Sequence, residues 1–166
     1  MSVETLFPEE ATSNGFRLDS LEVYNWGGFH NRIWRIVPGC DSVLITGANG
    51  SGKTTLADAL VTLLVPPVRR HYNQSSGSER KRDRTEESYV LGAFGSTRDD
   101  EAGRSDVSYL REKSCYSILV AVFRNNLSDS AFTLAQIRWF TPSGLQREYI
   151  TADTAMGIEE HFHPLD

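Results

Sequence analysis

Residues 47–54 of this chain read GANGSGKT, which has the spacing G-x-x-x-x-G-K-[ST]. Glycines let the backbone adopt positive φ and approach a ligand closely, so main-chain N–H groups can surround phosphate oxygens. Lys53 would place a positive charge beside the β- and γ-phosphates, and the Thr54 hydroxyl would offer an oxygen to Mg²⁺. The stretch therefore predicts a loop that holds a nucleotide by its phosphates.

The residues on both sides of the loop agree with this prediction. Residues 42–46 form an apolar stretch with a β-branched bias, which is typical of a buried strand. A helix is predicted from Lys53 to Leu64, and its positive N-terminal end would face the ligand. The alternative, a glycine-rich turn that binds nothing, would not need lysine and threonine at its end.

The loop also predicts which residues bind the cofactors, ATP and Mg²⁺. The predicted nucleotide-binding residues are Asn49, Gly50, Ser51, Gly52, Lys53, Thr54 and Thr55. Main-chain N–H groups of residues 49–52 would surround the phosphates, Lys53 would be the catalytic charge, and Thr54 would be the magnesium ligand.

Size, charge and cysteine content limit the class of protein. A chain of 166 residues predicts one domain, and a net charge of -5 argues against a protein that binds nucleic acid over its whole surface. Two cysteines are too few for a disulfide framework, and the acidic start does not resemble a signal peptide. Apolar runs stay far below the roughly 20 residues of a membrane-spanning helix. We therefore expect a soluble cytoplasmic protein without a membrane partner.

Turn-forming residues divide the chain into segments. Residues 1–15 are expected to form a flexible arm and residues 16–166 the folded domain, with a long polar insertion over about residues 66–113. Strands are predicted at residues 16–25, 29–37, 116–124, 133–140 and 147–151, and a final helix at residues 154–162. The expected fold is an α/β P-loop domain in which a strand, the loop and a helix are joined to an antiparallel strand lobe.

The predicted strands lack one feature of a complete P-loop hydrolase. Such an enzyme needs a second strand that ends in an acidic residue, which holds Mg²⁺ and polarises water. The strand that ends at Phe123 leads into Arg124, and the next strand ends in Thr141. We therefore expect this chain to bind ATP but not to hydrolyse it alone.

Several groups of residues resemble a known family. They are Phe16-Arg17-Leu18 with Asn25-Trp26-Gly27-Gly28-Phe29, the loop GANGSGKT, and Leu56-Ala57-Asp58-Ala59-Leu60. Together they resemble the N-terminal half of an SMC-type ATPase head. The segments 69–74 and 82–92 are similar to those of the MukB-like condensin ATPases, and most similar to the JetC family of the bacterial Wadjet plasmid-defence system.

This resemblance implies a split ATPase head of the ABC/SMC type. A C-terminal half of the same head would supply the acidic residues on the Mg²⁺ side and the signature motif, and paired heads would enclose ATP between them. The whole protein would be a DNA-translocating, loop-forming ATPase of the bacterial nucleoid that acts against plasmid DNA. The implied partners are a second head, a kleisin, accessory winged-helix subunits and double-stranded DNA. The family's glutamine loop has only a weak candidate, Gln136, which lies within a predicted strand.

The insertion begins with a basic segment. Between residues 69 and 84, six basic residues stand against Glu79 and Asp83. The candidate DNA-binding residues are Arg69, Arg70, Arg80, Lys81, Arg82 and Arg84. They predict contacts to DNA phosphates, although a solvated loop or, for Arg69 and Arg70, a position facing the nucleotide is also compatible with the sequence.

A self-contained small-molecule or nucleoside kinase is the alternative function. P-loop kinases of this kind have a similar length, but they usually begin with the strand that leads into the phosphate loop. Here some forty residues and a predicted hairpin precede that strand. The sequence therefore favours the ATPase half-head.

Overall fold

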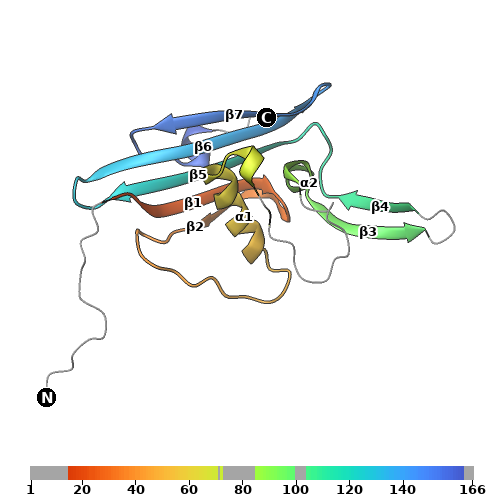
Figure 1. The fold of residues 1–166 in the computed structure, drawn as a ribbon, viewed down its shortest axis with the longest axis horizontal. Coiled ribbons are helices and arrows are strands. Elements are labelled where there is room, and N and C mark those ends of the chain that lie inside the picture. The colour runs from red at the N-terminus through yellow and green to blue at the C-terminus, as the bar shows by residue number, and fades with distance from the viewer. Residues whose placement is uncertain (1–14, 71, 73–84, 100–103, 163–166) are drawn as a thin grey trace, which may run out of the picture.

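The computed structural model describes residues 15–70, 72, 85–99 and 104–162, and the fold is mixed α/β (Figure 1). The strands are β1 (Arg17–Trp26), β2 (Phe29–Ile36), β3 (Ala93–Asp99), β4 (Arg104–Tyr109), β5 (Tyr116–Asn125), β6 (Ser130–Thr141) and β7 (Gly144–Ala152). The helices are α1 (Lys53–Leu64), a 3₁₀ turn η1 (Pro67–Arg69), α2 (Glu86–Leu91) and α3 (Ile158–His161).

The main sheet has five strands in the order β2-β1-β5-β6-β7, and every neighbouring pair is antiparallel. Strand β5 lies at its centre and is buried on both faces. Leu119 and Ala121 point toward α1 and α2, whereas Ile118 and Val120 pack with Ile158 of α3. Two helical layers on opposite faces explain why β5 reads as a continuous apolar run rather than an alternating one.

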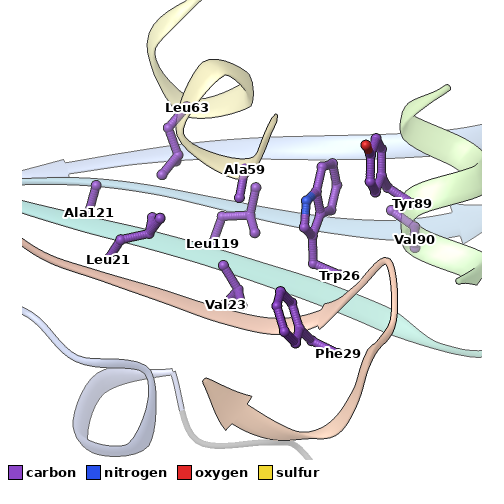
Figure 2. Close-up of a cluster of buried hydrophobic side chains, with 10 residues drawn as sticks. All are labelled: Leu21, Val23, Trp26, Phe29, Ala59, Leu63, Tyr89, Val90, Leu119 and Ala121. Carbon is purple, nitrogen blue, oxygen red and sulfur yellow. The ribbon is translucent and has the colours of Figure 1, made fainter. Parts of the chain in front are cut away.

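Helix α1 covers one face of this sheet. Figure 2 shows Ala59 and Leu63 of α1 above Leu21, Leu119 and Ala121 of β1 and β5. The helix ends where Val65 becomes extended, ahead of two prolines that cannot continue it. The helix thereby holds the end of the glycine-rich loop against the sheet.

The strand predicted at residues 42–46 is wrong. These residues have no regular structure, and Leu44 is 88% exposed, with Val43 and Ile45 also exposed. A strand is stable only when a neighbour pairs its N–H and C=O groups. Neither sheet of the described chain offers residues 42–46 such a neighbour.

The polar insertion contains elements that the sequence analysis did not predict. Thr85 and Ser88 form a capping box that begins α2, and Gly92 ends the helix in the left-handed region. Strands β3 and β4 form a separate two-stranded sheet, which extends away from the main sheet (Figure 1). Their serine- and aspartate-rich sequence lacks the apolar alternation that marks a half-buried strand.

The remaining segments match the predictions except at their ends. The β1–β2 hairpin forms as expected, β6 and β7 begin earlier than predicted, and the last helix is confined to Ile158–His161. The predicted arm at residues 1–15 lies almost wholly outside the described residues. Within the described part of the chain, no helix is long and apolar enough to cross a membrane.

Candidate nucleotide-binding site

The glycine-rich loop takes the backbone conformations that its glycines permit. Gly50 has a φ of 82° and Gly52 a φ of 93°, both in the left-handed region. The Ser51 N–H donates to the Ala48 carbonyl at 3.2 Å, which closes a turn within the loop. Residues 47–51 are exposed, so a ligand can reach their main-chain N–H groups.

The N-terminus of α1 carries no cap of its own. Gly52 is the N-cap residue and has no side chain to accept a hydrogen bond, and the first turn contains no acidic residue. The first N–H groups of a helix have no partner within the helix, and the helix dipole adds positive potential there. An anion such as a phosphate can therefore satisfy these groups.

Lys53 and Thr54 occupy the first turn of α1. The Lys53 ammonium donates to the carbonyls of Gly47 and Ala48 at 2.7 and 2.8 Å, so its charge lies across the loop. Thr54, the predicted magnesium ligand, is adjacent and partly exposed. These residues fit a phosphate chain that brings Mg²⁺ with it, because Mg²⁺ is commonly held by substrate phosphates and few protein oxygens.

The β1–β2 turn packs directly against the end of this loop. An ideal Cβ on Gly52 would lie 2.8 Å from Phe29 Cζ, and one on Gly27 would lie 2.6 Å from Thr55 Cγ2. The indole N–H of Trp26 donates to the Thr55 carbonyl at 3.1 Å. Trp26 and Phe29 are buried within the apolar cluster shown in Figure 2. Both side chains therefore serve as packing under the loop.

The two basic residues that follow α1 have different surroundings. Arg69 lies on the exposed turn η1. The Arg70 side chain is only 3% exposed, forms an ion pair with Glu86, and donates from Nε to the Val65 carbonyl at 2.6 Å. The other candidate DNA-binding residues, Arg80, Lys81, Arg82 and Arg84, lie outside the described residues.

A buried charged cluster joins α2 to the main sheet, and the sequence analysis did not identify it. The Glu86 carboxylate pairs with Arg70, with Arg138 at 3.6 Å and with Arg147 at 3.3 Å. Arg138 is fully buried, and burial, followed by the charge of Arg70, lowers the pKa of Arg138 to about 10. Its guanidinium also lies 5.3 Å from the centroid of the Trp26 ring. The sequence does not predict this cluster, because single polar residues such as Gln136 and Arg138 within β6 do not show which residues of other elements they contact.

Gln136, the weak candidate for a glutamine loop, is buried in β6. Its Nε2 donates to the Thr62 carbonyl at 3.0 Å, and its Oε1 accepts from Arg138. This side chain therefore binds the C-terminal turn of α1, at the opposite end of the helix from Lys53. No group of three or more His, Cys, Asp or Glu residues that could hold a metal ion occurs among the described residues.

Comparison with known proteins identifies the glycine-rich loop as a P-loop. Residues 18–79 match the family model described as the P-loop containing region of AAA domain. A solved structure from work on ATP-driven dimerization and DNA-stimulated activation of SMC ATPases is 19% identical, with a TM-score of 0.46 over 87% of this chain and 74% of that chain. No curated protein matches the chain. The site is thus a P-loop, carried on a mixed α/β fold with an antiparallel sheet.

Proposed function

We propose that this chain is the ATP-binding N-terminal half of an SMC-like ATPase head. The phosphate-binding features are the uncapped N-terminus of α1, the left-handed glycines and the Lys53 ammonium. Bound Mg²⁺ would neutralise phosphate charge, with Thr54 as its protein ligand. The resemblance of residues 16–29, of the loop and of α1 to SMC-type heads supports this reading over other P-loop proteins.

One observation carries the proposal that the head is completed by another segment. Residues 43–45 are apolar, immediately precede the P-loop, and are exposed and unpaired in the described chain. Exposed apolar side chains are unfavourable in water, and an extended segment forms a strand only when a neighbour pairs its backbone. A neighbouring strand from the C-terminal half of the head would bury these side chains and pair their backbone.

Exposed apolar residues at the end of α1 and in η1 also support completion of the head by another segment. Leu64 at the end of the helix is half exposed, and Val68 in η1 is 91% exposed. Both are apolar side chains that the described part of the chain leaves exposed. A second half of the head would cover these side chains as well as those of residues 43–45.

The completed protein would hydrolyse ATP after two heads close over the nucleotides. Its further partners in this proposal are a kleisin, accessory winged-helix subunits and double-stranded DNA, and its role is DNA loop extrusion in defence against plasmids, in the cytoplasm at the nucleoid. The exposed Arg69 and the basic residues 80–84 would contact DNA phosphates.

Amide hydrogen exchange tests the completion of the head. Without the other half, the amides of residues 43–45 should exchange as rapidly as those of an open chain. Adding the C-terminal half of the head should slow them at least about tenfold. Slow exchange in the chain alone would show that no strand is missing.

A further inference from the structure

Arg111 is a buried cation that lies directly after β4 and contacts carbonyl groups. Its Nε donates to the Val90 carbonyl at 2.7 Å, its Nη1 to Phe29 at 3.2 Å, and its Nη2 to Gly27 and Tyr89, both at 2.9 Å. Burial lowers the pKa of this guanidinium from its ordinary value. The planar fork of arginine has five N–H donors, so one side chain can serve all four carbonyls.

These carbonyls belong to two segments that are far apart in the sequence. Gly27 lies in the β1–β2 turn and Phe29 begins β2, while Tyr89 and Val90 lie in α2. The Gly27 N–H also donates to the Tyr89 carbonyl at 2.7 Å. A Cβ on Gly92 would lie 2.7 Å from Arg111 Nη2 and 2.8 Å from the Gly27 carbonyl, so this close approach requires glycine. Arg111 therefore fixes the turn to α2.

The same turn supports the P-loop. A side chain at Gly52 would collide with the Phe29 ring, and a side chain at Gly27 would collide with Thr55 of α1. Gly52 is the N-cap residue of α1, so the position of Phe29 affects where the first N–H groups of the helix lie. Arg111 is thus separated from the phosphate-binding groups by a single residue, Phe29.

We propose that Arg111 is a positioning residue for the nucleotide site, and this inference rests on the proposed binding of ATP at the P-loop. Its guanidinium holds the β1–β2 turn against Gly52 and so keeps the N–H groups of the loop aligned. Loss of the fork would remove the guanidinium donor from the buried Gly27 carbonyl, which is costly, and the turn would relax away from the loop. Bound phosphates would then meet donors in poorer geometry.

The primary variant is Arg111→Lys, which keeps the charge but has three donors on a single nitrogen. We expect it to weaken binding of ATP and of inorganic triphosphate by about tenfold each, because the contact affected is to phosphate rather than base. Thr133→Val is the matched control. Thr133 is also buried and hydrogen-bonds to Thr154 and Met156, away from α1 and the loop. It should lose stability without losing affinity.

Amide exchange of Leu56, whose N–H donates to the Gly52 carbonyl at 3.0 Å, gives a readout that needs no nucleotide. This amide should exchange faster in Arg111→Lys than in Thr133→Val when both are compared at equal stability. Phe29→Leu, which leaves the fork intact, should produce the same change, and the double variant should show little further effect. Equal exchange of the Leu56 amide in Arg111→Lys and Thr133→Val would overturn the positioning role.

The two readouts separate this inference from the proposed function. Failure of the unmodified chain to bind ATP would count against the proposed function, while the exchange comparison would still decide the role of Arg111. Normal ATP affinity in a folded Arg111→Lys variant would overturn the inference and leave the P-loop assignment intact.

Discussion

The Tyr89 hydroxyl donates a hydrogen bond to the buried carboxylate of Asp58, which joins α2 to the middle of α1. The Tyr89 ring also stacks on Trp26, with centroids 4.6 Å apart and planes 9° apart. The helix of the polar insertion is therefore part of the core that supports the P-loop helix.

Tyr89→Phe should lower the free energy of unfolding by about 1–3 kcal/mol, because it removes a donor to a buried carboxylate and keeps the ring stack. Urea denaturation would measure the change as a shift in midpoint at constant slope. The exposed Tyr109 offers a control, since Tyr109→Phe removes a hydroxyl from a side chain that is 47% exposed. An unchanged midpoint for Tyr89→Phe would contradict the proposed link between α1 and α2.

Lys53→Ala should weaken ATP binding roughly ten- to a hundredfold without unfolding the domain, because it removes a charge-assisted contact to phosphate. Titration with labelled ATP and Mg²⁺ would measure it. Lys113→Ala, which removes an exposed lysine that is paired with Glu87, is the charge-matched control. Equal affinity of Lys53→Ala and the unmodified chain would reject the phosphate-binding role of the loop.

The Glu86 cluster predicts an asymmetry between two substitutions. Glu86→Gln should destabilise the fold by about 3–5 kcal/mol, because it removes the carboxylate that three arginines share. Arg138→Met should cost much less, since it replaces a buried cation by an apolar side chain and leaves Arg70 and Arg147 paired. Chemical denaturation of both variants tests this order, and a larger loss for Arg138→Met would contradict it.

Replacing Arg80, Lys81 and Arg82 together with alanine should weaken binding to unrelated DNA duplexes by the same factor. Contacts to phosphates carry no base identity, and their loss reduces the dependence of affinity on salt. Binding titrations over a range of salt concentrations would measure the slope. A triple variant with the original slope would show that this segment does not contact DNA.

The sequence was sufficient to predict the hairpin, the P-loop and α1, because glycine spacing and local periodicity determine them. It was misleading at residues 42–46, where an apolar run indicates a strand only if another segment pairs with it. The roles of Arg111 and Arg138 could not be predicted, since their partners lie on other elements and only the tertiary fold brings them together. The capping box at Thr85 and Ser88 was visible in principle, but it precedes a helix too short to show periodicity.

We propose that this chain binds ATP but needs another half to hydrolyse it. A phosphate-release assay on the purified chain tests this proposal, with Lys53→Ala as the blank, ATP binding verified separately, and phosphoryl acceptors added in turn. We expect ATP binding that depends on Lys53 and no phosphate release above the blank, with turnover appearing only when the C-terminal half of the head is added. Turnover by the chain alone that disappears in Lys53→Ala would contradict the half-head and favour a self-contained kinase or hydrolase.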